Sequence, residues 1–388
     1  MLARPLLPVF FLSALLFALM GPFAHAQAPQ TQKGQASLVG TVTDAETGSP
    51  LASVNVFIAT STRGTTTDAD GRFRLPGVPL GAQRLYVSRI GYEPYAENLN
   101  LREARPYVFE VALSPSTTEL PEVVVEAERD EKWAERYDRF VRAFIGETPN
   151  AEQTDILNPE VLSFEGGIGR LRARAAEPLR IVNRGLGYRV EYHLRDFLLR
   201  PTRTQYDGEP LFESLEGSPE EQAQWAAARR EAFLGSFHHL MLAMLADRTE
   251  EQGFRLFLRP ESPGPAGLSA SRGPSTPLLS GQRFPTTTDE LLSDGETAGE
   301  HILTVQGMAE VLYLGEQESD AYKAWRAQYA RDGVRSRAPR VQTSQFWLER
   351  GPATIDYKGD VVDPYGVTVS GYYAFERVAD QLPKEYRP

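Results

Sequence analysis

The stretch Val54-Asn55-Val56-Phe57-Ile58 decides the fold of the first third of this chain. Val54, Val56 and Ile58 fall on one side of an extended backbone, and Asn55 and Phe57 fall on the other, so the period of two predicts a β-strand. Similar short runs follow the same logic at residues 38–42, 73–75, 85–87 and 107–113, with turn-forming sequences at 47–50, 68–71 and 76–77 between them. Because no helical pattern interrupts these strands, each must bury one face against an opposing sheet, which predicts an antiparallel β-sandwich over residues 36–114.

The same residues resemble a known family, the carboxypeptidase regulatory-like domain. The resemblance rests on Gly40-Thr-Val-Thr-Asp44, Thr47-Gly48-Ser-Pro50-Leu51, Val54-Asn55-Val56, Gly64-Thr-Thr-Thr67-Asp68-Ala-Asp70-Gly71-Arg-Phe73 and Ile90-Gly91-Tyr92-Glu93. It implies a transthyretin-like sandwich of about seven strands. In that family the module accompanies zinc carboxypeptidases or precedes the plug of TonB-dependent receptors, and it is not itself catalytic.

Residues 1–26 have the pattern of a signal peptide. Arg4 supplies the positive start, residues 9–20 form an apolar segment, and Ala24-His25-Ala26 is a small-x-small cleavage site. We therefore expect the mature chain to begin near Gln27, with no membrane-spanning segment left after cleavage and no lipidation cysteine. This predicts an exported protein, periplasmic, secreted or held at the cell surface of a Gram-negative bacterium, with no ATP, NAD or other cofactor.

Composition narrows the choice of partners. The formal net charge is −11, which repels nucleic acids and anionic membrane surfaces. Cysteine is absent from the chain, so folding must depend on core burial rather than on disulfides. We expect the partner to be an envelope protein, or a surface polysaccharide or peptide.

Residues 115–130 read as a linker that contains one strand-like segment. Leu120-Pro-Glu-Val123-Val124-Val125-Glu-Ala127 resembles the TonB-box segment that follows the same sandwich in receptors. The chain is too short to contain the plug and barrel of such a receptor. Val123, Val124 and Val125 are therefore either an internal strand or tether, or a segment that pairs with a partner's sheet edge.

Residues 131–388 are predicted to form a second, β-rich α+β domain with about three helices. Apolar spacing predicts a helix over residues 130–146, and the capping box at Ser218-Pro-Glu-Glu221 opens a long helix that we expect to run to about Arg248. A third helix carries Tyr322, Trp325 and Tyr329, and the end of the chain, through residues 372–375, is expected to be β. Residues 260–300 are rich in Pro, Gly and Ser and are expected to lack helix and strand.

The second half resembles a group of exported Bacteroidetes-type proteins that carry the same N-terminal sandwich. The matching segments include Leu157-Asn-Pro-Glu-Val161-Leu, Glu177-Pro-Leu-Arg-Ile-Val-Asn183 and Tyr372-Tyr-Ala-Phe-Glu-Arg377-Val-Ala-Asp380. That group has no established activity, so the resemblance implies compartment and architecture but no mechanism.

The sequence contains no complete catalytic or metal-binding pattern. A zinc carboxypeptidase would need His-x-x-Glu and a distant histidine, and neither His193, His238, His239 nor His301 has that spacing. Arg229, Ser236 and His239 are the candidates for a hydrolytic site; the alternative is that they satisfy polar groups within a packed helix. No metal or cofactor is expected.

Two further groups of residues have a structural and a functional interpretation. Asp68 and Asp70, and likewise Asp356, Asp360 and Asp363, could be metal ligands but fit hairpin turns better. The aromatic residues Tyr365, Tyr372, Tyr373 and Phe375 could form a sugar-stacking platform, although alternating aromatic residues in strands favour a core position.

Three functional hypotheses follow. The first is a non-catalytic envelope protein acting in binding, scaffolding or assembly. The second is a hydrolase with its site around Arg229, Ser236 and His239, which requires these side chains to meet in a solvent-connected cleft with a carboxylate in reach. The third is partner docking through Val123, Val124 and Val125.

Overall fold

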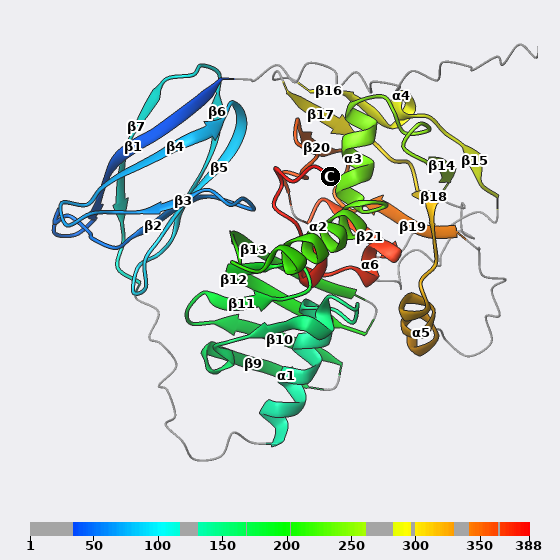
Figure 1. The fold of residues 1–388 in the computed structure, drawn as a ribbon, viewed down its shortest axis with the longest axis horizontal. Coiled ribbons are helices and arrows are strands. Elements are labelled where there is room, and N and C mark those ends of the chain that lie inside the picture. Colours follow the sequence, from blue (N-terminus) through cyan, green and yellow to red (C-terminus); the bar gives the residue numbers. More distant parts are fainter. Residues whose placement is uncertain are drawn as a thin grey trace, which may run out of the picture. The chain divides into compact units, whose positions relative to one another are not determined.

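The structure, a computed structural model, describes residues 34–116, 131–167, 169–201, 203–260, 282–295, 299–329, 341–363 and 365–388. The fold is mainly β, as predicted, and contains several antiparallel sheets (Figure 1). Val123, Val124 and Val125 lie outside the described residues.

The N-terminal part is a β-sandwich, as predicted from its alternating pattern. Its strands are β1 (Gln35–Asp44), β2 (Asn55–Ile58), β3 (Gly64–Thr66), β4 (Arg72–Pro79), β5 (Gly81–Ser88), β6 (Tyr95–Leu101) and β7 (Pro106–Leu113). They form two sheets, in the orders β4-β1-β7 and β3-β2-β5-β6. The pairing of β1 with β7 is parallel, so the expectation of a wholly antiparallel sandwich is wrong at this one pair. It can be parallel because β7 joins β1 only after the chain has passed through the other strands.

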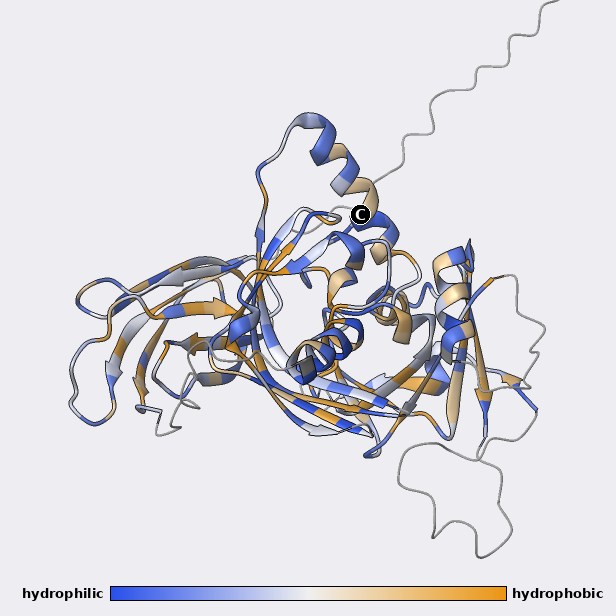
Figure 2. Cartoon of the chain, turned by 90° about the horizontal axis from the view of Figure 1, so that it is seen from below, coloured by the Kyte–Doolittle hydropathy of each residue, from blue (hydrophilic) through white to orange (hydrophobic). Residues whose placement is uncertain are grey.

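The sandwich core holds the apolar side chains that alternate along the strands, among them Leu38, Val56, Ile58 and Leu85, each at most 1% exposed. Figure 2 shows apolar and polar residues alternating along many of the strands. The turn at Asp68–Gly71 is the predicted hairpin turn: Asp68 Oδ1 accepts hydrogen bonds from the backbone N–H groups of Asp70 and Arg72.

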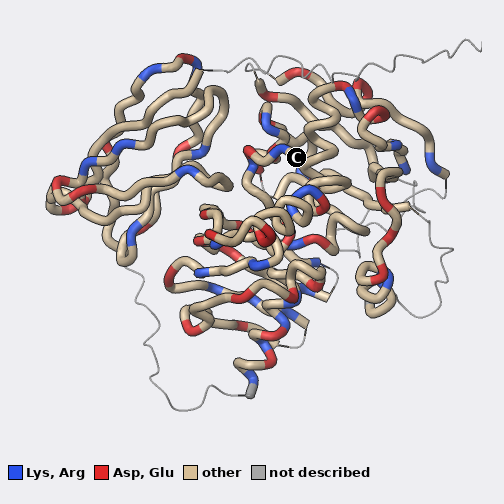
Figure 3. Tube along the Cα trace, viewed as in Figure 1, with Lys and Arg blue, Asp and Glu red and all other residues tan. Residues whose placement is uncertain are grey.

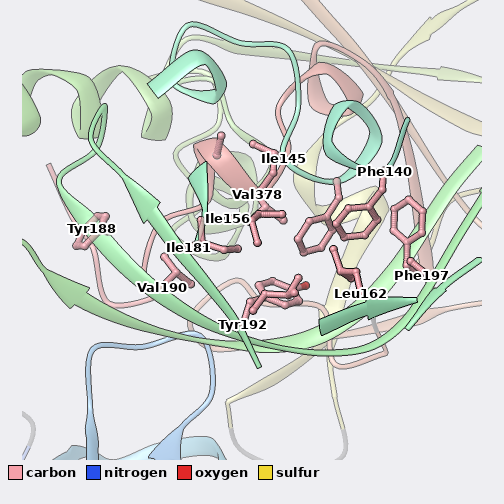
Figure 4. Close-up of a cluster of buried hydrophobic side chains, with 14 of the residues drawn as sticks. Phe140, Ile145, Ile156, Leu162, Ile181, Tyr188, Val190, Tyr192, Phe197 and Val378 are labelled. Carbon is pink, nitrogen blue, oxygen red and sulfur yellow. The ribbon is translucent and has the colours of Figure 1, made fainter. Parts of the chain in front are cut away.

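A second core lies between helix α1 and a six-stranded sheet. The elements are α1 (Glu131–Phe144), β8 (Thr154–Ile156), β9 (Leu162–Gly167), β10 (Arg170–Ala175), β11 (Leu179–Asn183), β12 (Tyr188–Arg200) and β13 (Arg203–Ser214), with short 3-10 turns η1 (Ala151–Gln153) and η2 (Pro159–Val161). Phe140 of α1 packs against Phe197 of β12 (Figure 4). Phe144 of the same helix packs against Tyr192 of β12. Helix α1 stops where expected, because Gly146 adopts φ +113, a conformation that glycine tolerates.

The third core is built on a five-stranded and a three-stranded sheet. Its elements are α2 (Pro219–Phe233), α3 (Phe237–Leu245), β14 (Phe254–Arg259), β15 (Phe284–Pro285), α4 (Thr288–Leu291), β16 (Leu292–Asp294), β17 (Glu300–Leu303), β18 (Met308–Gln317), α5 (Asp320–Tyr329), β19 (Val341–Leu348), β20 (Ala353–Asp356), β21 (Val367–Gly371), α6 (Tyr372–Phe375) and η3 (Val378–Asp380). The five-stranded order is β15-β14-β18-β19-β21, and the three-stranded order is β16-β17-β20. Helix α3 contributes Leu240, Met241 and Met244 to this core.

Three local expectations are wrong. The long helix after the capping box is two helices, because Leu234 is extended and Gly235 adopts φ +75 between α2 and α3. Residues 372–375 form the helix α6 rather than a strand, because the extended backbone of β21 ends at Gly371, whose φ is +71. Within the expected loop at 260–300, the described part from residue 282 onward carries β15, α4, β16 and the start of β17, since Thr287 and Glu290 form a capping box there.

Among the described residues, no helix has both the length and the apolar character needed to cross a membrane.

Candidate functional site

A cleft of about 1620 Å³ is lined by residues from the sandwich, from the six-stranded sheet and from the third core. The sandwich contributes residues 82–84 and 98–100, β13 contributes residues 203–209, and the third core contributes residues 360–363 and 367–371. This volume exceeds that of ordinary small-molecule pockets, so the cleft is large enough for an extended ligand.

The sandwich contributes to the cleft because one of its sheets packs against the six-stranded sheet. Phe57 points away from the sandwich core, as the period of two requires, yet it is 0% exposed. Its ring lies 5.1 Å from that of His193 on β12, and Tyr86 lies 5.2 Å from the same histidine. Backbone hydrogen bonds join Thr60 to Pro210 and Phe212 to Ser61. The sandwich and the six-stranded sheet are therefore joined by side-chain packing and by backbone hydrogen bonds at residues 210–212 of β13.

Charged side chains follow one face of β13 into the cleft. Asp207 and Glu209 are two residues apart and so project to the same side of the strand. Glu209 is 2.6 Å from Arg84 of the sandwich and 3.1 Å from Arg195 of β12, and Arg195 is also 2.6 Å from Asp207. Burial raises the pKa of Glu209, and the two arginines oppose that change. These ion pairs connect the sandwich to strands β12 and β13, which line the cleft. Figure 3 shows basic and acidic residues interspersed along the sheet that carries β13.

The tip of the β12–β13 hairpin is tied to the third core by a second network. The Arg203 guanidinium is 2.7 Å from Glu349 and donates a hydrogen bond to Thr368 Oγ1 at 3.0 Å. The indole N–H of Trp347 donates to the same glutamate. These contacts fix the side of the cleft formed by β19 and β21.

Several buried charged side chains lie close together, at the turn that follows β20 and near the C-terminal end of the chain. Asp356 Oδ1 accepts hydrogen bonds from the backbone N–H groups of Lys358 and Asp360, which is the hairpin role predicted for these aspartates. Lys358 is 7% exposed, and its Nζ donates to Gln83 Oε1 of the sandwich at 2.7 Å. Burial lowers the pKa of Lys358 to about 7 and raises the pKa values of Asp356 and Asp360. Lys384 Nζ lies 3.9 Å from Asp360 Oδ2.

Aromatic side chains line the part of the cleft formed by the third core. Trp325, Trp347 and Tyr365 are partly exposed there, and Phe375 is buried beneath. Tyr372 and Tyr373 are buried, at 9% and 6% exposed, so the core interpretation holds for them. Of the aromatic residues proposed as a stacking platform, Tyr365 keeps an exposed surface in the cleft, and the two tryptophans were missed. The positions of Trp325 and Trp347 in the sequence form no pattern that would predict a shared site.

The residues proposed as a hydrolytic site do not meet as that hypothesis requires. His239 is 4% exposed; its Nδ1 accepts from the Gly235 N–H, and its Nε2 lies 3.2 Å from Gln252 Oε1. Ser236 Oγ caps α3 by accepting from the His239 N–H and donates to the Phe233 carbonyl. None of these bonds involves a carboxylate.

Arg229 is occupied elsewhere. Its guanidinium donates to the carbonyls of Leu186 and Gly187 and lies 4.0 Å from the ring centroid of Tyr188. Neither Arg229, Ser236 nor His239 lines the cleft. The structure therefore does not bring the three side chains together in a solvent-connected cleft, which is the arrangement that the hydrolase hypothesis requires. Their helical spacing suggested a shared face, but the break at Gly235 separates Arg229 from the other two.

Two further histidines, His193 and His238, lie close to carboxylates. His193 lies at the sandwich junction, 2.9 Å from Glu191, and His238 Nδ1 lies 3.6 Å from Asp360. Burial lowers the pKa of His238 to about 3. Within the described part of the chain, no group of three or more His, Asp or Glu side chains is arranged to hold a metal ion.

Comparison with solved structures gives low overall similarity. A type II cohesin–X-dockerin complex from Acetivibrio cellulolyticus is 16% identical with a TM-score of 0.18, covering 21% of this chain and 58% of that chain. The Bacillus anthracis TIE protein is 16% identical with a TM-score of 0.19, covering 21% and 17%. Catechol 1,2-dioxygenase from Acinetobacter is 16% identical with a TM-score of 0.20, covering 26% and 59%. This chain thus spans less than two thirds of each.

No curated protein matches the sequence. The sequence model of one domain family does match, and it does so over the strands of the sandwich and the segment that follows. Residues 38–125 of this chain match the CarboxypepD_reg-like domain.

Proposed function

We propose that this chain is an exported, non-catalytic binding protein of the Gram-negative envelope, and that its ligand occupies the cleft between the three cores. The observation that carries the proposal is the cleft itself, because separate cores contribute its walls and hydrogen-bonded ion pairs hold those walls together. Such a site is preorganised, so little conformational entropy is lost when a ligand binds. Export is supported by the leader-like residues 1–26, and a binding or scaffolding role is supported by the CarboxypepD_reg-like domain.

Several features of the lining support ligand recognition. Two of its carboxylates already have partners: Glu209 is paired with two arginines, and Asp356 Oδ1 accepts a hydrogen bond from the backbone of its turn. The partly exposed side chains of Trp325, Trp347 and Tyr365 offer flat apolar surfaces, and polar side chains, such as the amide of Gln205, can form hydrogen bonds with a ligand. This combination fits a polysaccharide of the cell surface.

A peptide is the second candidate ligand, and strand topology favours it. Strand β21 is the last strand of its sheet, and β13 pairs only with β12 apart from the contacts of residues 210–212 with the sandwich. Within the described residues, the 203–209 edge of β13 and the outer edge of β21 therefore keep free backbone N–H and C=O groups in the cleft. An extended peptide could add to either edge as a further strand.

The test is calorimetric titration of the chain from Gln27 onward with a neutral glucan, polygalacturonate and a tryptic digest of casein. Trp347→Ala removes an aromatic side chain from the cleft, and Trp133→Ala is the matched control, because Trp133 lies on α1 and does not line the cleft. We expect binding of at least one ligand class, weakened about tenfold by the first change and unaltered by the second. Equal affinity of the two variants for every bound ligand would refute the cleft as the site.

A further inference from the structure

Strand β13 presents its edge to the cleft. Residues 203–209 of this strand all line the cleft, without a gap. Successive side chains of a strand point to opposite faces, so a strand that lined the cleft with one face would contribute every second residue. The unbroken run indicates that the cleft meets the strand edge-on. The other edge of β13 pairs with β12.

Backbone hydrogen bonds show which residues of β13 direct their N–H and C=O groups away from β12. The Leu215 N–H donates to the carbonyl of the residue that precedes β12, so the odd-numbered residues face β12. The Pro210 carbonyl accepts from the Thr60 N–H of the sandwich. The Phe212 N–H donates to the Ser61 carbonyl, so the even-numbered residues face the other way.

The same alternation continues to the start of β13. The register shift between the two strands places its extra residue on β12, between Leu194 and Asp196, so β13 itself stays regular. Thr204, Tyr206 and Gly208 therefore direct backbone donors and acceptors away from β12. In the part of the chain that the structure describes, no strand pairs with these three residues on that side.

The sandwich already uses this edge in the manner of a strand. Ser61 pairs with Leu211 as a parallel bridge, and Thr60, just before it, lines the cleft. At the other end of the edge, the Arg203 guanidinium lies 2.7 Å from Glu349 and holds the start of β13 to the third core. Between these two ends, residues 203–209 leave an open edge of roughly 23 Å, at about 3.3 Å per residue.

Charge in the cleft does not favour a strongly charged ligand. Basic and acidic side chains line the cleft in nearly equal number. On β13 itself, Asp207 lies 2.6 Å and Glu209 lies 3.1 Å from the Arg195 guanidinium, so these carboxylates are already neutralised. What remains is a backbone donor and acceptor at every second residue. The main chain of an extended peptide has the same repeat, and a glycan does not.

We infer that the cleft binds an extended, uncharged peptide segment, which adds to residues 204–208 of β13 as a further strand. This inference rests on the proposed binding function and names its ligand class. The peptide continues along β13 the pairing that residues 60–61 of the sandwich begin. Its affinity comes from main-chain hydrogen bonds, as in other cases of strand addition to a sheet edge.

The first test uses two ligands that differ in main-chain hydrogen bonding alone. One is the acetylated and amidated peptide Ser-Thr-Val-Thr-Val-Thr-Ser, and the other carries an N-methyl group on each of its central residues. The methyl groups remove N–H donors and keep the side chains and the zero charge. We expect calorimetric titration of the full chain to show binding of the unmodified peptide and binding about tenfold weaker, or weaker still, for the methylated one.

The second test changes the edge itself. Thr204→Pro removes an outward N–H group from β13 and keeps its pairing with β12, because proline is tolerated at the free edge of a strand. Thr66→Pro is the matched control: Thr66 ends the edge strand β3, and it lies outside the cleft. Its N–H also points outward, since the next residue, Thr67, donates to the Val54 carbonyl. We expect Thr204→Pro to weaken peptide binding about tenfold and Thr66→Pro to leave it unchanged.

The inference and the binding function fail separately. Equal affinity for the two peptides overturns strand addition, and so do equal effects of the two proline variants, once thermal unfolding shows that both are folded. If a neutral glucan or polygalacturonate binds in a manner that Trp347→Ala weakens, and the peptide does not bind, strand addition is wrong and the binding function stands. If neither glycan nor peptide binds, both fail. Should Thr204→Pro not fold, the methylated peptide still tests the unaltered chain.

Discussion

Replacing Phe57 by alanine tests whether the sandwich and the six-stranded sheet share one packed junction. Phe57 is completely buried, but it points away from the sandwich core and owes its burial to His193 and its surroundings. Truncating a fully buried phenylalanine costs about 3–5 kcal/mol, which combines lost transfer free energy with the cavity that remains. In the isolated fragment of residues 34–116 the same ring would lie on the surface of its sheet, where the change should cost less than about 1 kcal/mol.

Val56→Ala is the matched control, because Val56 neighbours Phe57 in the chain but faces the sandwich core. It should destabilise the full chain and the fragment alike, by roughly 1–3 kcal/mol.

The assay is denaturant unfolding followed by two signals. The sandwich contains no tryptophan, because the four tryptophans of the chain are Trp133, Trp225, Trp325 and Trp347. Circular dichroism therefore follows unfolding of the fragment, and tryptophan fluorescence follows unfolding of the remaining cores in the full chain. If Phe57→Ala destabilises the fragment as much as the full chain, or if it destabilises neither of them, the junction does not bury this ring and the reasoning fails.

Three further changes test the interior. Lys358→Met should alter the pH dependence of stability. The pKa of Lys358 is about 7 in the folded chain and near 10.5 in the unfolded chain, so between these pH values the unfolded chain binds more protons. The stability of the wild type should therefore rise with pH over this range, by on the order of 3–5 kcal/mol for this group. The variant should lose that rise and Lys323→Met, on exposed α5, should retain it; parallel curves for wild type and Lys358→Met in urea titrations would contradict the argument. Ser236→Ala should cost about 1 kcal/mol by removing the cap of α3, and Ser236→Asp should restore it without changing ligand affinity; a loss of binding in either would indicate a functional serine. Gly235→Ala should lower the thermal midpoint, because the new Cβ would lie 2.4 Å from Gln342 Oε1 and the backbone needs φ +75; an unchanged midpoint would exclude this helix break.

Local structure was predictable where one short segment contains the whole signal. The alternation at Val54–Ile58 predicted a strand of the sandwich, and the capping box at Ser218 predicted the start of α2 correctly. The break between α2 and α3 also had a signal, since Gly235 can adopt a left-handed conformation and Ser236 is a favoured cap. The apolar spacing continued across the break and masked it. The helix at residues 372–375 is a single turn, too short for any periodic pattern.

The cleft could not be predicted, because its residues come from distant parts of the chain. Lys358 and Gln83 are 275 positions apart and become neighbours only when the sandwich packs against the third core. Arg84 and Glu209 meet in the same way. Ser236 and His239, two of the candidates chosen from sequence, are close in the chain, and the contact that the structure gives them is the cap of α3.

Hydrogen exchange with and without a saturating concentration of the unmodified Ser-Thr-Val-Thr-Val-Thr-Ser peptide tests the central claim most directly. The account predicts slowed exchange at the backbone amides of β13 over residues 203–209 and of β21, where the ligand would cover the cleft. Protection confined to the β4-β1-β7 sheet of the sandwich, with no change in β13 or β21, would contradict it.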